Sequence, residues 1–204
     1  MNLPPPSKIV CVGRNYVEHA KELGNDVPEQ PLIFLKPPSS LIGNSDAIVL
    51  PPQSRRVEHE GEIGVVIGRR CRNVSAAEAM ARVAGFVPLN DVTARDLQRS
   101  DGQWTRAKGF DTFCPLGSTT PAEEVDSLSL EVICRVNGET RQHGHLRDMA
   151  FPIPVIIEYI SSVMTLLPGD VIATGTPAGV GPLCTGDVVE VEIPGVGRLS
   201  NPVL

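Results

Sequence analysis

The chain has 204 residues, 41% of them hydrophobic, and a formal net charge of −6 at pH 7. This size suits one globular domain spanning 1–204, and the acidic balance argues against nucleic acid as a partner, because binding to phosphates needs a basic surface. No apolar stretch could span a membrane, no signal-peptide pattern opens the chain, and five scattered cysteines indicate the reduced thiols of a cytoplasmic protein.

The order of apolar, polar and turn-forming residues predicts a strand-rich α+β chain with few, short helices. Strands are expected at 8–13, 31–36, 47–50, 57–68 and 84–89, and helical segments at 15–23 and 93–98. A further helix should follow Ser75, where Glu78 completes a capping box. In the second half, Asn137-Gly138 predicts a hairpin between 129–136 and an arm returning from 139, and 153–164 predicts the best-defined helix. Strands preceded by turns are expected within 167–175 and 186–194.

Two glutamates stand two positions apart in the predicted strand 57–68, and an aspartate follows the next strand. Residues two apart in a strand point to the same face, so Glu60 and Glu62 could reach one ion, with Asp91 closing the site from a neighbouring element. An all-oxygen set suits Mg²⁺, Mn²⁺ or Ca²⁺, and such an ion could polarise a ketone or hold an enolate. The alternative is a solvated strand edge with alternating charge.

A histidine and a glutamate three positions apart share one face of the first predicted helix. A carboxylate beside an imidazole orients the ring and raises its basicity, so Glu22 could support His19 as a general base. The glycine-flanked polar stretch after this helix would let the segment move as a lid. The alternative is a surface helix stabilised by an ordinary side-chain pair.

Three more polar side chains follow the aspartate along the chain. Arg95 and Gln98 lie four and seven residues after Asp91, on one helical face, where the guanidinium could bind a substrate carboxylate. Lys108 lies in an aromatic, turn-rich stretch, where a positioned ammonium could stabilise developing oxyanion charge. The alternative is that Arg95 and Lys108 are ordinary exposed residues with no role in a site.

Two motifs fit a ligand site less well. The run GTPAGVG (175–181) lacks the order of a phosphate-binding loop, so its backbone and Thr176 either approach a ligand or form a plain turn. His143 and His145 form an H-x-H pair, but zinc would need further histidine or cysteine ligands at metal spacing nearby. We therefore do not expect zinc there.

Six segments in a fixed order resemble the fumarylacetoacetate hydrolase family, most closely its short, single-domain branch of acylpyruvate hydrolases and oxaloacetate decarboxylases. They are VGRNYVEH (12–19), FLKP (34–37), HEGEIGVVIG (59–68), DVTARDLQ (91–98), WTRAK (104–108) and TGTPAGVG (174–181). Each motif alone is modestly specific, whereas six in this order are highly specific.

This resemblance implies a mixed β-sheet roll of the type found in that family's C-terminal domain, usually assembled as a homodimer. The residues that match the family's Mg²⁺ or Mn²⁺ ligands are Glu60, Glu62 and Asp91. His19 and Glu22 match its catalytic pair, on a lid that orders over substrate. The substrate-contacting positions are matched by Arg95, Gln98, Lys108 and Thr176.

The activity implied by the resemblance is metal-dependent hydrolysis of a C–C bond in a 2,4-dioxo acid. Such an acylpyruvate, for example fumarylpyruvate or acetylpyruvate, would give pyruvate and a carboxylic acid. His19 would activate water and Lys108 would stabilise the oxyanion. The alternatives are oxaloacetate decarboxylation, isomerisation or decarboxylation of a hydroxymuconate-type diacid of aromatic catabolism, and a non-catalytic metal-binding module. The enzymatic alternatives share a metal-stabilised enolate, so the metal ligands do not separate them.

Overall fold

The computed structural model describes residues 3–204, so the first two positions of the N-terminal segment considered above lie outside the described residues. The strands are β1 (Ile9–Gly13), β2 (Leu32–Lys36), β3 (Leu41–Ile42), β4 (Val57–His59), β5 (Gly61–Ile67), β6 (Val83–Asn90), β7 (Thr93–Ala94), β8 (Cys114–Pro115), β9 (Thr120–Pro121), β10 (Glu131–Val136), β11 (Glu139–His145), β12 (Val171–Ala173), β13 (Gly181–Pro182), β14 (Val188–Ile193) and β15 (Gly197–Pro202). The helices are α1 (Val17–Glu22), α2 (Ala76–Ala79), α3 (Arg95–Ser100), α4 (Thr105–Lys108) and α5 (Ile153–Val163), and single 3-10 turns lie at Pro38–Ser40, Met80–Arg82, Ala122–Glu124 and Leu146–Asp148.

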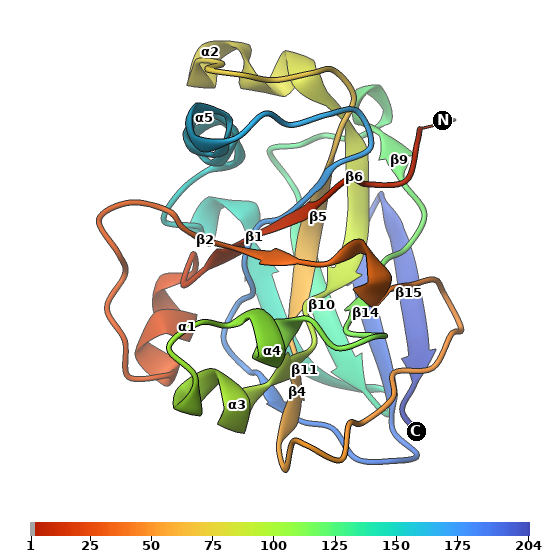
Figure 1. Cartoon of the computed structure of the whole chain (residues 1–204). Helices are drawn as coiled ribbons and strands as arrows, with labels where there is room; N and C mark the ends of the chain where they lie inside the picture. Colours follow the sequence, from red (N-terminus) through yellow and green to blue (C-terminus); the bar gives the residue numbers. More distant parts are fainter. Residues whose placement is uncertain (1–2) are drawn as a thin grey trace.

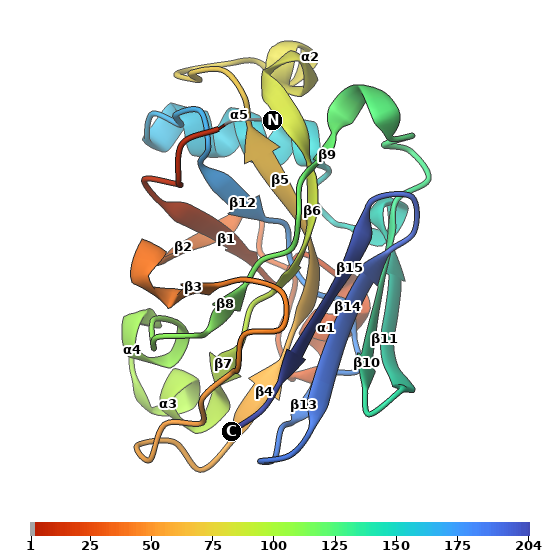
Figure 2. The ribbon, with the colours of Figure 1, turned by 90° about the vertical axis from the view of Figure 1, so that its right-hand side faces the viewer.

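Two larger sheets and two small ones build the molecule. The six-stranded sheet, β2-β1-β12-β5-β6-β9, is mixed, because β1 and β12 run parallel while the other neighbours run antiparallel. The four-stranded sheet, β11-β10-β14-β15, is antiparallel, and β13-β4-β7 and β3-β8 form the small sheets. Figures 1 and 2 show the long strands β5 and β6 running through the middle of the molecule. The predicted strand-rich, mixed-sheet fold with few short helices is confirmed.

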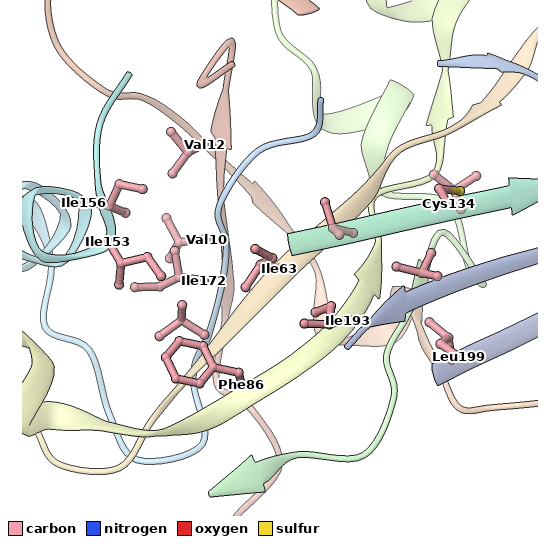
Figure 3. Packing of buried hydrophobic residues seen from close by; sticks show 14 of the residues in the cluster. Val10, Val12, Ile63, Phe86, Cys134, Ile153, Ile156, Ile172, Ile193 and Leu199 are labelled. Carbon is pink, nitrogen blue, oxygen red and sulfur yellow. The ribbon is translucent and has the colours of Figure 1, made fainter. Parts of the chain in front are cut away.

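The core lies on both faces of the central strand β5, every residue of which is buried. The larger cluster lies on one face of the sheet, where α5 packs Ile153 and Ile156 towards β1 and β12 and the four-stranded sheet contributes Ile193 and Leu199 (Figure 3). A smaller cluster on the other face includes Ile9, Val171 and Ala173. Because neither face of β5 meets water, its sequence reads as a nearly continuous apolar run rather than as strict alternation. No helix within residues 3–204 is long and apolar enough to cross a membrane.

Three predicted elements differ in detail from the structure. The segment 47–50 is no regular strand: its Ile48 makes one isolated bridge to Val203, because it runs as an extended arm beside the C-terminal residues. The predicted strand 57–68 is interrupted at Glu60, whose N–H donates to the side chain of Asn90 instead of to a strand partner. The helix predicted at 93–98 begins only at Arg95, because 93–94 pair with β4 as β7.

A buried aspartate ties the start of the chain to the centre of the large sheet. Asp170 precedes β12, and its carboxylate accepts hydrogen bonds from the Ser7 N–H at 2.9 Å, the Ser7 hydroxyl at 2.7 Å and the Leu167 N–H at 2.8 Å. It also forms an ion pair with the Lys8 ammonium, while its own side chain is 0% exposed. Burial would raise the pKa of Asp170, but Lys8, the Leu167 N–H and Ser7 outweigh it and hold the pKa below its ordinary value.

We predict that Asp170→Asn lowers the free energy of unfolding at pH 7 by about 2–3 kcal/mol, since an amide cannot accept all of these hydrogen bonds. A carboxyl group whose pKa is lowered by folding stabilises the protein above its unfolded pKa of about 3.9 and loses that effect as the pH falls through the folded value. The difference between the wild type and the variant should therefore shrink below about pH 4. Urea denaturation at several pH values tests this, with the exposed Asp111→Asn as control. An equal difference at pH 7 and pH 3 would contradict it.

Candidate active site

A pocket of about 260 Å³ opens where α1, α3 and α4 meet the start of β5. Figure 1 shows these three short helices together at the lower left, beside β4. Eight of the nine predicted site residues line the pocket: His19, Glu60, Glu62, Asp91, Arg95, Gln98, Lys108 and Thr176. The ninth, Glu22, stands behind His19 and holds its ring. The motifs quoted from six separate segments thus meet at one place.

The three predicted ligand carboxylates converge as their spacing suggested. Glu62 lies on β5, Glu60 occupies the break before it, and Asp91 directly follows β6. The antiparallel pairing of β5 with β6 places Gly61 opposite Asn90, and the Asp91 N–H donates to the Glu60 carbonyl at 2.9 Å. One carboxylate oxygen from each residue lies within 4.8 Å of the others, and all three side chains are buried. The interpretation as a solvated strand edge is wrong.

Buried cations neutralise two of the three carboxylates. The Lys108 ammonium donates to Glu60 at 2.8 Å and to Asp91 at 2.6 Å. Burial would raise the pKa of Glu60, but Lys108 and Arg95 outweigh it and lower that pKa. Burial would also lower the pKa of Lys108, whereas Asp91 and Glu60 raise it, so the lysine stays charged.

Glu62 is the carboxylate that lacks such a partner. Its one hydrogen bond within residues 3–204 comes from the Gly175 N–H at 2.8 Å, from a backbone with φ of 103° that favours glycine. Burial, followed by the charges of Asp91 and Glu60, raises the pKa of Glu62 well above its ordinary value. A divalent cation would relieve this repulsion and accept one oxygen from each carboxylate. The site therefore fits Mg²⁺ or Mn²⁺, which prefer oxygen ligands and tolerate open positions.

The predicted histidine–glutamate pair is formed at the mouth of the pocket. His19 Nδ1 lies 3.2 Å from Glu22 Oε2, and Glu22 Oε1 accepts a hydrogen bond from the Gly179 N–H at 3.0 Å. Glu22 thereby connects α1 to the turn 174–181. If Nδ1–H donates to Glu22, the other ring nitrogen, Nε2, carries the free lone pair that a general base needs. The His19 side chain is 6% exposed, and its ring lines the pocket.

Besides Lys108, the other three predicted substrate-contacting residues are also held by neighbouring groups. Arg95 donates from Nε to Glu58 at 2.6 Å, from Nη2 to Glu60 at 2.5 Å and from Nη1 to Gln98 at 2.6 Å. Thr176 donates to the Gly61 carbonyl at 2.8 Å and accepts from Gln142 at 2.7 Å. Their roles toward a substrate stay predictions, but each side chain is fixed at the pocket wall.

Several residues of the site were not singled out from the sequence. Lys36 ends β2 and donates to Asp91 at 2.6 Å from a fully buried position, where the sequence shows only a lysine closing an apolar run. Glu58 precedes Glu60 by two, so the same alternation could have found it. Arg14 and Arg99 line the pocket, and no carboxylate within residues 3–204 forms an ion pair with either of them. Arg14 also has a positive φ of 57°, which is uncommon outside glycine and recurs at functional sites.

Comparison with known proteins identifies the family. The model of the fumarylacetoacetate hydrolase C-terminal family matches residues 8–204, nearly the whole chain. The chain belongs to the fumarylacetoacetate hydrolase family, as the order of its motifs indicated.

Three similar proteins illustrate the range of named activities. The chain is 48% identical over 202 residues to a mitochondrial oxaloacetate tautomerase of Arabidopsis thaliana, covering 97% of this chain and 91% of that protein. A structure of 5-carboxymethyl-2-hydroxymuconate delta-isomerase from Mycobacterium smegmatis is 48% identical, with a TM-score of 0.90, and the match covers 99% of this chain and 81% of that one. A fumarylpyruvate hydrolase structure from Pseudomonas aeruginosa, in complex with Mn²⁺ and pyruvate, is 32% identical, with a TM-score of 0.93 and coverage of 98% and 90%.

We predict that Glu62→Gln stabilises the metal-free protein, because it removes one buried charge from a repelling set. A carboxyl group whose pKa is raised by folding opposes folding increasingly above its unfolded value of about 4.3, so the gain should be larger at pH 8 than at pH 5. Each kcal/mol gained should raise the Tm by about 2–4 °C. Thermal unfolding in the presence of a chelator measures this difference in Tm between the variant and the wild type at each pH.

The same variant should lose the metal effect on the Tm. Added Mg²⁺ or Mn²⁺ should raise the Tm of the wild type, because an ion that binds only the folded state stabilises it. Glu123→Gln, which removes an exposed carboxylate, should behave as the wild type does. A Glu62→Gln variant that is less stable without metal, or as strongly stabilised by it, would contradict this account of the site.

Proposed function

We propose that the chain interconverts keto and enol forms of a 2-oxo dicarboxylic acid with Mg²⁺ or Mn²⁺ as cofactor. The observation that carries this proposal is the carboxylate triad of Glu60, Glu62 and Asp91 beside the His19–Glu22 pair in one pocket. The triad would hold the ion, which polarises the 2-oxo group as a Lewis acid. A non-catalytic binding module would not need an oriented base beside its ion.

The protein groups provide for the proton transfer. His19 Nε2 takes a proton from C3 of the keto acid, the C–H electron pair becomes the C2–C3 double bond, and the carbonyl pair moves onto oxygen. That oxygen then receives a proton, which gives the enol. Glu22 stabilises the imidazolium formed in between. Lys108 holds a positive charge at the pocket wall, where it opposes the negative charge that develops on the substrate oxygen.

The charge of the pocket favours a substrate with two carboxylates. Arg95 is already engaged by Glu58 and Glu60, whereas Arg14 and Arg99 line the same pocket without an ion-pair partner among the described residues. A second, distal carboxylate would give these two guanidinium groups a partner. Oxaloacetate is the smallest 2-oxo acid of this kind that enolises towards a second carboxylate.

The sequence comparisons favour tautomerisation of oxaloacetate over hydrolysis. The Arabidopsis protein named oxaloacetate tautomerase is 48% identical to this chain, and the fumarylpyruvate hydrolase is 32% identical. Hydrolysis of a fumarylpyruvate-type dioxo acid is the second candidate, since the same His19–Glu22 pair could remove a proton from water. The hydroxymuconate-type isomerisation named for the Mycobacterium smegmatis protein is a third reaction of the same enol chemistry.

A substrate panel tests these activities, with Mg²⁺, with Mn²⁺ and with a chelator. Loss of the oxaloacetate enol absorbance without new products would support tautomerisation, while release of CO₂ would indicate decarboxylation. Pyruvate and fumarate from fumarylpyruvate would establish hydrolysis instead. Metal-independent rates, or no turnover of any of these acids, would overturn the proposal.

We predict that His19→Gln lowers kcat by about 10²- to 10⁴-fold, the usual contribution of a general base. Glu22→Gln should have a smaller effect, because it only weakens the orientation of the imidazole. Glu18→Gln is the matched control, since Glu18 lies on the same helix and pairs with exposed Lys21. Steady-state kinetics at saturating metal give the comparison. Equal activity of the His19→Gln and Glu18→Gln variants would remove His19 from the mechanism.

We predict that Arg14→Gln and Arg99→Gln each raise KM for oxaloacetate by about 3- to 30-fold. This is the loss expected for a charge-assisted hydrogen bond that solvent partly screens. The KM for a monocarboxylic acylpyruvate such as acetylpyruvate should change little, if that acid is turned over. Arg70→Gln removes an exposed arginine outside the pocket and serves as control. Equal changes for both acids, or none for either, would exclude a distal carboxylate site made by these arginines.

Three further expectations belong to this proposal. Movement of α1 as a lid over a bound substrate would bring His19 and Glu22 into their working positions. We expect a homodimer, in line with the family resemblance. A cytoplasmic location is supported by five cysteines that are all unpaired within the described residues.

A further inference from the structure

A second group of metal-binding side chains lies on the β10–β11 hairpin. Glu131, His143 and His145 each offer one ligand atom, and these atoms all lie within 4.8 Å of one another. Glu131 Oε2 is 2.8 Å from His143 Nε2 and 3.4 Å from His145 Nδ1. The side chains of the two histidines are 50% and 37% exposed, so an ion from solvent can reach them.

The hairpin register brings these three residues together. In the antiparallel pair, Glu131 lies opposite His145, and His143 lies opposite Ile133. His143 and His145 are two apart on β11, so both rings lie on the same face of the hairpin. Glu131, on the neighbouring strand β10, lies on that face too. The third ligand is therefore 12 positions away from the nearer histidine in the sequence but adjacent to both in space.

This face is separate from the proposed active site. Gln142, which directly precedes His143 on β11, is buried on the opposite face and donates to Thr176 at 2.7 Å. The alternation that sends Gln142 into the site sends His143 away from it. Figure 2 shows β11 at the outer edge of the four-stranded sheet, with β10 beside it.

The distances suit a tetrahedral ion. Zinc lies about 2.0–2.1 Å from imidazole nitrogen and about 2.0–2.2 Å from carboxylate oxygen, which separates the ligand atoms of a tetrahedron by about 3.3–3.5 Å. The distance of 3.4 Å between Glu131 and His145 already has this length. The pair at 2.8 Å would open by about half an ångström, within reach of small χ rotations of an exposed histidine.

Neighbouring residues on this face form ordinary cross-strand or same-strand ion pairs. Arg135 pairs with Glu192 at 2.6 Å and Arg141 with Glu139 at 3.0 Å. Glu131 differs from Glu192 and Glu139, because its two partners are imidazoles rather than guanidinium groups. A neutral imidazole can bind a metal ion, which a guanidinium group cannot do. Since two rings point at one carboxylate oxygen, a divalent ion can take the place of the proton between them.

We propose that Glu131, His143 and His145 form a second metal site, which takes Zn²⁺ or a similar divalent ion with a preference for imidazole. Three protein ligands leave one position open for water or another ligand. The all-oxygen triad at Glu60, Glu62 and Asp91 favours Mg²⁺ or Mn²⁺ instead, so the two sites differ in the ion they select.

The test measures zinc binding by calorimetry in excess MgCl₂, on the wild type and in a Glu62→Gln background that disables the first site. Both should take up one Zn²⁺ ion at the hairpin. His143→Gln, His145→Gln and Glu131→Gln should each weaken that uptake by at least about tenfold, the loss expected even for a supporting group of a metal site. Glu139→Gln, on the same strand, is the matched control and should bind as the wild type does.

Imidazole NMR supplies a readout that is independent of activity. The chain has four histidines, so single substitutions assign every ring. Zinc should shift the resonances of His143 and His145 while those of buried His59 stay in place. Circular dichroism without metal checks that each variant folds. The proposal fails if the three ligand variants bind zinc as the control does, or if zinc uptake disappears in the Glu62→Gln background.

Discussion

The structure of the candidate active site depends on one buried cluster of charges. It contains four carboxylates, from Glu58, Glu60, Glu62 and Asp91, and three cations, from Lys36, Arg95 and Lys108. Buried charges are stable when they are paired and hydrogen-bonded, so the side chains joined by these ion pairs have little freedom to move. The network holds the wall of the pocket in place before any ligand arrives.

The strand-rich fold is what brings these groups together. The β5–β6 pairing aligns Asp91 with Glu60, while the break between β4 and β5 aims Glu60 at Lys108 and Arg95. The turn at 174–181 then closes the site from a different part of the chain, with the Gly175 N–H on Glu62 and the Gly179 N–H on Glu22. Because these contacts join distant segments, the site is part of the core rather than an addition to its surface.

Much of this arrangement could be predicted from local patterns. The alternation of Glu60 and Glu62 in an apolar run indicated a shared face, and the spacing of His19 and Glu22 indicated a shared helical turn. Local sequence patterns did not reveal contacts in which one residue comes from a distant part of the chain. In the sequence, Lys36 has the pattern of an exposed residue at the end of a strand. In the structure it is buried and pairs with Asp91, which follows β6. The H-x-H pair lacked a third ligand in the sequence, because only the hairpin register brings in Glu131.

The charge count of the cluster also gives an order to ligand binding. Without a metal, Glu62 is the carboxylate of the cluster that Lys36, Arg95 and Lys108 leave without an ion-pair partner. A divalent cation would supply the missing positive charge and, together with the guanidinium groups of Arg14 and Arg99, would strengthen the attraction of the pocket for an anionic acid. The metal ion and an anionic substrate should therefore bind cooperatively, with the ion first. This order follows from the fold itself, since no lysine or arginine within residues 3–204 forms an ion pair with the Glu62 carboxylate.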